Sequence, residues 1–408
     1  MTEQSLATRV AQHAEIMRHA CLVLYAGASL MPVARARLMT PELSAMPVMG
    51  PADAKEQPGA TFVTDLEHEA AQAACDLFGA DWAEVRLPSC TLANLAVYAH
   101  FTRPGDTVLG PAAADGGHLS QRAGGTPALV GLEVQPLVYD PREQMLDQST
   151  TVARIKAYRP SLVILGRSVV LKPDLIETVV DAAHDHGALV MFDASHVLGL
   201  IAGGAFPNPF EAGVDLITSS TYKTLCGPTG GVVLGARSTD GEKFSNFLNA
   251  GFLANQDAAR LPALLDAFKA FQTHPGRAQR ILSCATALKA AFRNEGIDVL
   301  LTKEPAQTHQ IVVPIGSEAE ARAAMLRLEA GNVLVGTCAV PGRSGEYGLR
   351  FGAQILADVP GLTHEDYALL ARGIGSVLAT SDEVADRFAL SRIVRDMLAH
   401  YEAVRPLQ

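Results

Sequence analysis

Two residues with reactive side chains follow short apolar runs near the middle of the chain. Asp193 comes directly after the run Leu189–Phe192, and Lys223 follows the run Val214–Ile217 within a stretch rich in serine and threonine. These runs, with Gly231–Leu234, have the length and the residue types of buried strands. Because ligands of open α/β sheets bind beyond the carboxyl ends of strands, we expect the acid and the amine to lie close together.

A buried acid beside an amine is the arrangement that pyridoxal phosphate requires. The lysine forms a Schiff base with the cofactor, and the acid keeps the pyridine nitrogen protonated so that the ring can accept electrons. Each residue also has a structural explanation, since an aspartate often caps a helix and a lysine is usually solvated. The flanking sequence favours the cofactor, because the glycines of residues 227–231 allow close approach to a ligand. Four hydroxyl residues could hold a phosphate: Ser219, Ser220, Thr221 and Thr224.

The composition narrows the class of protein. The chain has 408 residues, of which 48% are hydrophobic and 19% are charged, and its formal net charge is −10 without a basic stripe. This argues against nucleic acid as a partner. No apolar run reaches the length of a membrane span, and the polar N-terminus does not resemble a signal peptide. The six scattered cysteines form no CxxC pair, so we expect free thiols, a cytoplasmic location and no metal site.

The central stretch resembles one family in particular. Residues 193–209 read Asp-Ala-Ser-His-Val-Leu-Gly-Leu-Ile-Ala-Gly-Gly-Ala-Phe-Pro-Asn-Pro, and residues 218–231 read Thr-Ser-Ser-Thr-Tyr-Lys-Thr-Leu-Cys-Gly-Pro-Thr-Gly-Gly. Both stretches are similar to the core of serine hydroxymethyltransferase, a fold-type I (aspartate aminotransferase-like) pyridoxal phosphate enzyme. The resemblance covers roughly residues 65–235 and weakens towards both ends.

The predicted fold is of the α/β class. Strands alternate with helices of crossover length, which predicts a mainly parallel sheet with right-handed connections. The resemblance implies a fold-type I transferase, with a seven-stranded type of sheet in a large domain and a smaller α+β C-terminal domain. We divide the chain into an N-terminal helical arm (1–25), a large cofactor-binding domain (26–280) and a small domain (281–408). The resemblance also implies a homodimer in which the arm packs on the partner subunit.

The resemblance assigns residues to the cofactor. Ser89, Cys90 and Thr91 stand at a strand-to-helix turn where the family holds the phosphate, and a helix N-terminus there offers free N–H groups and a positive dipole end. His118, in the family's Gly-Gly-His-Leu motif, would stack on the pyridine ring. Ser168 aligns with a family serine near the cofactor O3′. Thr221, in the Ser/Thr-rich turn, completes this group together with the acid, histidine and lysine of the core.

Three residues are expected to carry the chemistry and two to bind the substrate. Lys223, His118 and His196 are the catalytic candidates, and Asp193 and His196 also contact the cofactor. Arg350 lies in Tyr-Gly-Leu-Arg-Phe-Gly, where the family clamps the substrate α-carboxylate through two parallel N–H···O bonds. Ser29 matches a family serine near the same carboxylate. The expected partner is therefore a small-molecule substrate, an amino acid whose side chain the sequence does not identify.

One segment departs from the family. Family members carry tyrosines and a catalytic glutamate, used with folate, where this chain has Met46–Gly59. Counting from Asp65 places Gly50 at the position of the glutamate, and a glycine side chain cannot transfer a proton. Nearby acids that a rearranged loop could recruit are Glu42, Asp53 and Glu56. Further on, Asp257 and Ala258 replace glycines whose backbone reaches the phosphate across the family's dimer interface.

These features lead to one expected function and several alternatives. We expect folate-independent aldol or retro-aldol chemistry at Cα–Cβ of an amino acid bound as an external aldimine, as in an aldolase or transaldolase. A repurposed relative could instead catalyse β-elimination, decarboxylation or deamination of an unusual bulky amino acid in natural-product biosynthesis. A true serine hydroxymethyltransferase is a second alternative. A cofactor-binding scaffold without catalysis is disfavoured, because it would not need the carboxylate clamp.

Overall fold

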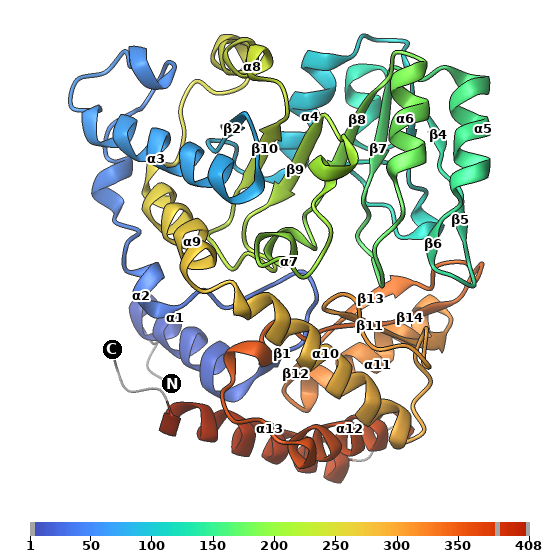
Figure 1. Cartoon of the computed structure of the whole chain (residues 1–408). Coiled ribbons are helices and arrows are strands. Elements are labelled where there is room, and N and C mark those ends of the chain that lie inside the picture. The colour runs from blue at the N-terminus through green and yellow to red at the C-terminus, as the bar shows by residue number, and fades with distance from the viewer. Residues whose placement is uncertain (1–4, 380–383, 405–408) are drawn as a thin grey trace. The chain divides into compact units, whose positions relative to one another are not determined.

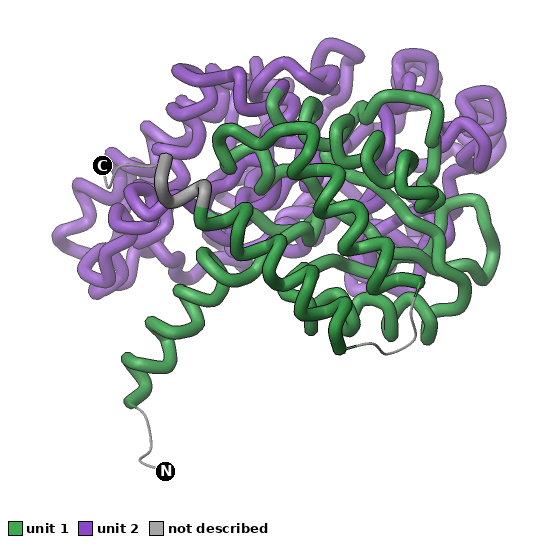
Figure 2. Tube along the Cα trace, turned by 90° about the horizontal axis from the view of Figure 1, so that it is seen from below, with its two compact units in different colours: residues 1–30, 280–408 green, residues 31–279 purple. Residues whose placement is uncertain are grey.

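The chain forms two compact units. The computed structural model describes residues 5–379 and 384–404. Unit 1 consists of Met1–Leu30 with Arg280–Gln408, and unit 2 consists of Met31–Gln279; Figure 2 draws them in different colours. Each unit has its own sheet and its own hydrophobic core. The division into an arm, a large domain and a small domain stays a prediction.

Unit 2 is built on a seven-stranded sheet. In spatial order its strands are β2 (Trp82–Glu84), β10 (Gly231–Gly235), β9 (Leu216–Ser220), β8 (Leu189–Asp193), β7 (Leu162–Leu165), β3 (Thr107–Gly110) and β4 (Glu133–Pro136). β10 runs antiparallel to both of its neighbours, and the strands from β9 to β4 are parallel to one another. The predicted α/β fold with a mainly parallel, seven-stranded sheet is therefore confirmed.

Helices pack around this sheet. They are α2 (Val33–Ala36), α3 (Thr61–Phe78), α4 (Cys90–Phe101), α5 (Gln148–Tyr158), α6 (Glu177–Asp185), α7 (Leu198–Ala202), α8 (Ser238–Gly251) and α9 (Leu261–Thr273), and β5 (Tyr139–Asp140) with β6 (Met145–Leu146) forms a small hairpin. α3 packs along α9, and α5 lies beside α6 (Figure 1). α4 contacts β9 and β10, which places its first turn near the strands that carry the candidate site.

The central strands are apolar because both of their faces are covered. Leu162, Ile164 and Met191 are fully buried and pack with residues of α4 such as Ala96 and Val97. Burying an apolar side chain of this size contributes about 1.5–3 kcal/mol. A strand covered on both faces needs no polar side chain, so the polar residues at the strand ends must have another role.

Local sequence explains several element boundaries. α3 begins at Thr61. α9 and α10 (Gly276–Asn294) are separate helices on either side of Pro275, because proline lacks the N–H that would continue α9. The expected N-terminal helix is α1 (Leu6–Glu15) followed by a π-helical turn (Ile16–Ala20).

Unit 1 has an α+β architecture, as expected for the C-terminal domain. Its three-stranded antiparallel sheet has the order β11 (Gln310–Gly316), β14 (Tyr347–Gly352), β13 (Gly336–Ala339), and β1 (Leu22–Val23) pairs in parallel with β12 (Val333–Leu334). α10, α11 (Glu318–Ala330), α12 (His364–Ala379) and α13 (Val384–Val404) complete the unit. Leu349 and Phe351 of the central strand are fully buried in its core.

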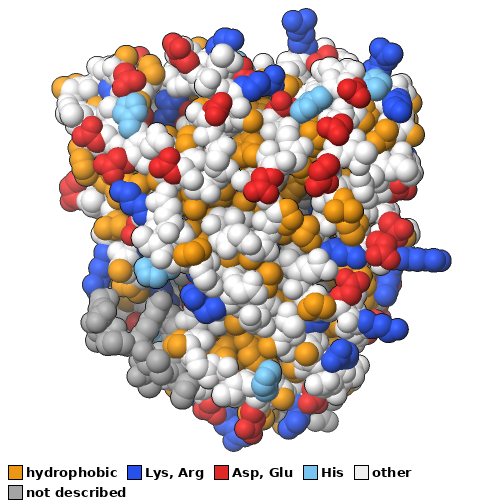
Figure 3. Space-filling view, in the orientation of Figure 1, with side chains coloured by type: hydrophobic (Ala, Val, Ile, Leu, Met, Phe, Trp, Pro, Cys, Tyr) orange, Lys and Arg blue, Asp and Glu red, His pale blue; other side chains and the backbone are white. Residues whose placement is uncertain are grey.

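The surface carries charges of both signs. On the face drawn in Figure 3, acidic and basic side chains are interspersed, and neither sign gathers into one patch. Within residues 5–379 and 384–404, no helix is both long enough and apolar enough to cross a bilayer. The cytoplasmic location inferred from the cysteines stays a prediction.

Candidate active site

Asp193 and Lys223 follow neighbouring parallel strands of unit 2. Asp193 is the last residue of β8, and Lys223 lies three residues beyond the end of β9 at Ser220. The register pairs Asp193 with Thr218 on β9. Both Asp193 and Lys223 line the same cavity at this edge of the sheet. The structure therefore brings the acid and the amine together.

Most residues expected to bind the cofactor line this cavity. They are Ser89, Cys90, Thr91, His118, Ser168, Asp193, His196 and Lys223. Thr221 is fully buried and does not line the cavity. Its hydroxyl donates to the carbonyl oxygen of Pro228 at 2.5 Å. The structure thus collects side chains from several loops that are far apart in the sequence. Their roles towards the cofactor stay predictions.

Asp193 is surrounded by hydrogen-bond donors. The backbone N–H of Ser195 donates to Oδ1 at 3.0 Å, and Asn94 Nδ2 donates to Oδ2 at 3.0 Å. The thiol of Cys90 lies 3.6 Å from Oδ1. Burial, and then the nearby negative charge of Asp193, raise the pKa of the Cys90 thiol well above its usual range. Cys90 is therefore a neutral thiol that can donate to the carboxylate.

Lys223 lies beside a histidine. Its Nζ is 3.2 Å from His196 Nε2, and both residues line the cavity. Thr224 holds the backbone of His196 in place. Its hydroxyl donates to the carbonyl oxygen of His196 at 3.0 Å and accepts from the N–H of Gly199 at 3.0 Å. A proton can therefore be held between two nitrogen atoms at this end of the cavity.

The hydroxyl residues around Lys223 are bonded to the backbone of the protein. Ser219 and Ser220 belong to β9 instead of a turn. Ser219 donates to the carbonyl oxygen of Ser220, and Ser220 donates to that of Ser195. Thr221 and Thr224 also donate to carbonyl oxygens. These hydrogen bonds shape the loop that carries Lys223, and the expected contact of the hydroxyls with a phosphate stays a prediction.

The first turn of α4 forms a polar corner of the cavity. Ser89 is its N-cap and accepts from the N–H of Leu92 at 3.2 Å. A side chain on Gly231 would lie 2.3 Å from the carbonyl oxygen of Ser89, so only glycine allows β10 to approach this turn. The free N–H groups and positive dipole end of α4 make the corner suitable for a phosphate.

The loop that carries His118 also depends on glycine. Gly116 has a φ of 84°, and a Cβ there would lie 2.7 Å from the side chain of Val169. A Cβ on Gly117 would lie 2.2 Å from the carbonyl oxygen of Pro111. Ser168 is tied to the same loop, since its N–H donates to the carbonyl oxygen of Gly116 at 2.7 Å. The loop therefore holds His118 and Ser168 at one side of the cavity.

Several residues of the site were not recognised in the sequence. Asn94 contacts Asp193 from the middle of α4, and Ser120, Ser195 and Tyr222 line the cavity. One signal was present, because Asn94 is the only strongly polar residue in the run Leu92–Ala99 of a helix that packs on the sheet. An amide in such a position needs buried partners.

The substrate candidates Ser29 and Arg350 both belong to unit 1. Arg350 is 8% exposed and lies in β14, the central strand of the small sheet. The fully buried Gln354 donates to the carbonyl oxygens of Tyr25 and Ala28 at 2.8 and 2.5 Å. Gln354 thereby ties the loop before Ser29 to the end of β14, a role that the sequence did not reveal.

Polar contacts hold the segment 46–59 in place. Lys55 forms a buried ion pair with Glu67 at 2.7 Å and donates to the carbonyl oxygen of Gly50 at 3.0 Å. Asp53 is largely exposed and pairs with His68 at 2.8 Å. Gly50 has a φ of 87°, and a Cβ there would lie 2.5 Å from the carbonyl oxygen of Ala54. The backbone at position 50 therefore favours glycine over any acidic residue.

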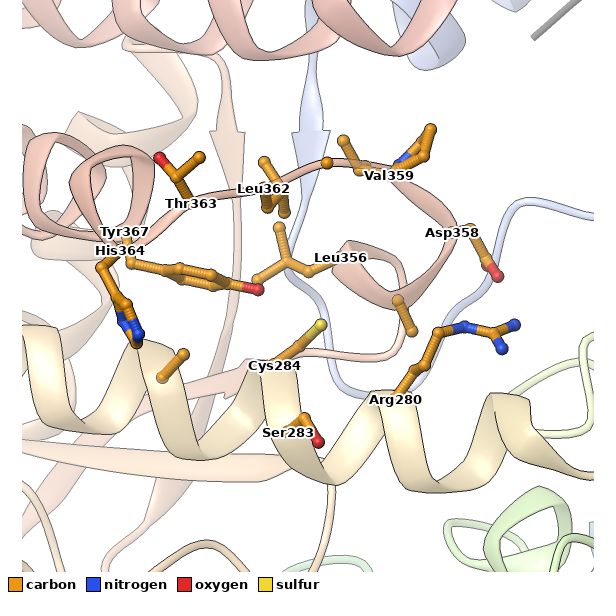
Figure 4. A pocket seen from close by; sticks show the side chains of 14 residues that line it. Arg280, Ser283, Cys284, Leu356, Asp358, Val359, Leu362, Thr363, His364 and Tyr367 are labelled. Carbon is orange, nitrogen blue, oxygen red and sulfur yellow. The ribbon is translucent and has the colours of Figure 1, made fainter. Parts of the chain in front are cut away.

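A larger cavity lies in unit 1. Its volume is about 840 Å³, and it is lined by residues of α10 and of the segment 356–364 (Figure 4). Cys284 and Tyr367 are hydrogen-bonded at its wall, and burial raises the pKa of both groups. The predicted site residues are absent from its lining. Volume alone therefore does not mark the candidate site, and the reactive groups are in the unit 2 cavity.

The residues of the unit 2 cavity fit pyridoxal 5′-phosphate. The first turn of α4 suits the phosphate, the carboxylate of Asp193 suits the pyridinium nitrogen, and Lys223 supplies the amine that would hold the cofactor covalently. His118 adds a flat ring to the lining. The donor set thus combines the three groups that this cofactor needs.

We predict that Lys223 is the lysine that binds the cofactor, because it lies in the cavity that also contains Asp193. Reduction of the holoenzyme with borohydride, followed by peptide mapping, should place the label on Lys223. The comparison lysines are Lys172, which pairs with Glu143, and Lys243 in α8. A label on either of them would contradict the assignment.

We predict that Gly50→Ala lowers the free energy of unfolding by about 1–3 kcal/mol, because the residue would have a positive φ and would crowd Ala54. Gly59→Ala is the matched control, since Gly59 has a φ of 78° with nothing within 4 Å of its Cβ position. Gly59→Ala should lower the free energy of unfolding by less than Gly50→Ala does. Urea unfolding of the holoenzymes measures both losses. Equal losses would show that the contact with Ala54 is unimportant.

Comparison with known proteins identifies the family. The family model described as serine hydroxymethyltransferase matches residues 49–373. A serine hydroxymethyltransferase of Methanopyrus kandleri is 31% identical over 371 residues, which cover 89% of this chain and 86% of that protein. An α-methylserine aldolase of Variovorax paradoxus is 32% identical over 330 residues, which cover 79% and 74% of the two chains.

A solved structure supports the fold. The crystal structure of L-threonine transaldolase from Pseudomonas fluorescens matches with a TM-score of 0.88 and 23% identity, covering 97% of this chain and 91% of that one. This likeness shows a common fold. The family model spans most of the chain, and the relatives exceed 30% identity. The chain therefore belongs to the serine hydroxymethyltransferase family of pyridoxal phosphate-dependent enzymes.

Proposed function

We propose that this protein breaks or forms the Cα–Cβ bond of a β-hydroxy amino acid without folate, as an aldolase or transaldolase. The observation that carries the proposal is the backbone at Gly50. A φ of 87° and the contact with Ala54 leave no room for the acidic residue that the family uses with folate. The nearby acids are directed elsewhere: Glu42 accepts from the hydroxyl of Thr40, Asp53 is paired with His68, and Glu56 is exposed.

Retro-aldol cleavage makes definite demands on the site. The β-hydroxyl loses its proton to a base, the Cα–Cβ bond breaks, an aldehyde leaves, and Cα then gains a proton. The cofactor, when bound, supplies the electron sink for the charge at Cα. The protein must therefore provide a proton acceptor and donor near the amine and must hold the substrate carboxylate.

The residues of the chain can meet these demands. Lys223 Nζ and His196 Nε2, 3.2 Å apart, can accept a proton from the substrate and return it. Asp193, fixed by Asn94 and Ser195, would keep a positive charge on the ring nitrogen that it faces. Arg350 would bind the α-carboxylate through a bidentate contact. Removing the folate-dependent step still leaves this set intact.

The relatives support aldol chemistry. Three α-methylserine aldolases of Variovorax paradoxus are 30–32% identical to this chain over 79% or more of its length. By its name, such an enzyme cleaves an amino acid that carries a hydroxymethyl group and a methyl group on Cα. We propose a substrate of the same class for this protein, namely an amino acid with a β-hydroxyl group.

We also propose that the protein works as a homodimer. Leu6 and Val10 of α1 are 73% and 61% exposed, and Ile16 of the π-helical turn that follows is 50% exposed. A second copy of the chain would remove this apolar stripe from water. Light scattering of the holoenzyme should give twice the mass of one 43.1 kDa chain. A mass of one chain at micromolar concentration would contradict the proposal.

We predict that tetrahydrofolate does not stimulate the reaction. The holoenzyme is supplied with serine, threonine or α-methylserine, with and without tetrahydrofolate, and the released amino acid and aldehyde are measured. We expect cleavage of at least one of these substrates at a rate that folate leaves unchanged. A working folate step would instead raise glycine release from serine by about 10²–10⁴-fold, the usual contribution of a proton-transfer group.

Two outcomes would contradict the proposal. Strong stimulation of serine cleavage by folate would identify a true hydroxymethyltransferase. Loss of ammonia or carbon dioxide without aldehyde would identify elimination, deamination or decarboxylation. Lys223→Ala serves as the control in every reaction, because any product that survives in it does not come from this site.

A further inference from the structure

A chain of buried polar groups connects Asp193 to His118. Asn94 Nδ2 donates to Asp193 Oδ2 at 3.0 Å and to the hydroxyl of Ser120 at 2.9 Å. Thr218 donates its hydroxyl hydrogen to Asn94 Oδ1 at 2.6 Å. Asn94 and Thr218 are fully buried, and Ser120 is 1% exposed. The side-chain amide of Asn94 cannot be flipped, because Oδ1 would then face the carboxylate of Asp193, and both groups are hydrogen-bond acceptors only.

The next link fixes the histidine. The hydroxyl oxygen of Ser120 accepts from Asn94, so its own hydrogen is available to His118 Nδ1, 2.8 Å away. The backbone N–H of Ser120 donates to the same Nδ1 at 3.2 Å. A backbone N–H can only donate, so Nδ1 must carry a lone pair. A neutral imidazole with an unprotonated Nδ1 has its hydrogen on Nε2.

The backbone around the ring supports this geometry. The N–H of His118 donates to Gln121 Oε1 at 2.9 Å, and Gln121 Nε2 donates to the carbonyl oxygen of Gly166 at 3.2 Å. Tyr98, fully buried in α4, donates its hydroxyl hydrogen to the carbonyl oxygen of Ser120 at 2.7 Å. The turn that presents Ser120 to His118 is therefore held from both sides.

We propose that Asn94 and Ser120 are positioning residues that hold His118 as the neutral imidazole with its hydrogen on Nε2, so that His118 is a hydrogen-bond donor in the cavity. The proposal deepens the proposed function and rests on it for the nature of the substrate. Because Nδ1 is occupied by Ser120 and Nε2 carries the hydrogen, His118 does not accept the proton of the β-hydroxyl. Proton acceptance then falls to the Lys223–His196 pair.

The same network links Asp193 and His118, the two groups that would contact the cofactor. Asn94 gives one amide hydrogen to the acid that would pair with the ring nitrogen, and the other to the serine that orients the stacking histidine. A neutral His118 can lie against a pyridinium ring without placing a second positive charge beside it. One asparagine thereby sets the orientation of both groups.

The tautomer can be measured directly in the holoenzyme. Long-range ¹H–¹⁵N correlation spectra of protein with ¹⁵N-labelled histidine distinguish a nitrogen that carries hydrogen from one that does not. The His118→Gln variant assigns the signal by its loss. We expect Nε2 to carry the hydrogen and Nδ1 to be bare at neutral pH. A hydrogen on Nδ1, alone or together with one on Nε2, would overturn the proposal.

Variants test the role of the network. Asn94→Ala should replace the single His118 signature by a mixture and lower kcat/KM by roughly 10–100-fold, the range found for residues that support a functional ligand. Ser120→Ala removes the hydroxyl through which Asn94 acts on His118, so it should change the His118 signature at least as much as Asn94→Ala does. Tyr98→Phe is the matched control, since it removes a bond to the same turn without touching His118, and it should keep the signature.

The outcomes separate this inference from the proposed function. If Asn94→Ala leaves both the His118 signature and kcat/KM unchanged, the positioning role is wrong. If Tyr98→Phe changes the signature as much as Asn94→Ala, the effect is a general loosening of the turn and the specific role is also wrong. If Asn94→Ala fails to fold, the spectra of the wild-type protein and of Ser120→Ala still test whether the network sets the tautomer of His118. The spectra need no substrate, so they stand whichever bond the enzyme breaks.

Discussion

The buried carboxylate of Asp193 imposes the strongest constraint on the structure of the site. A negative charge at the end of a buried strand is costly unless donors surround it. The protein supplies these donors from the following turn, through the N–H of Ser195, and from α4, through Asn94 and Cys90. The positions of Asn94 and Cys90 on α4 and the turn after β8 together meet this requirement.

α4 serves the cavity twice. Its first turn, capped by Ser89, offers N–H groups where a phosphate would bind. Its second turn carries Asn94, whose amide donates to the hydroxyl of Ser120, and Ser120 in turn is hydrogen-bonded to His118. An anion corner and a buried amide on one helix give the site a rigid geometry, because moving either part would displace the other. Rigid support of this kind is what orients catalytic groups.

The segment before α3 has the local structure on which the proposed loss of the folate step rests. Gly50 has a left-handed backbone that crowds Ala54, and Lys55 pairs with Glu67 beneath it. These contacts stabilise a loop conformation in which an acid at position 50 would be strained. The cofactor cavity is built from other loops and does not depend on this segment. Divergence here is therefore compatible with an intact reactive centre.

The sequence by itself determined the fold class, the family and the placement of Asp193 and Lys223 after neighbouring strands, because strand length, apolar runs and the glycine-rich turns are local properties. The departure from the family over Met46–Gly59 was also visible in the sequence. Only the tertiary structure decided which side chains meet. Asn94 and Asp193 are 99 residues apart, and Thr218 reaches Asn94 across 124 residues, so their contacts depend on the packing of α4 on the sheet. The hydrogen bond from the Thr221 hydroxyl to the carbonyl oxygen of Pro228 is likewise a product of the folded loop, which local sequence does not specify.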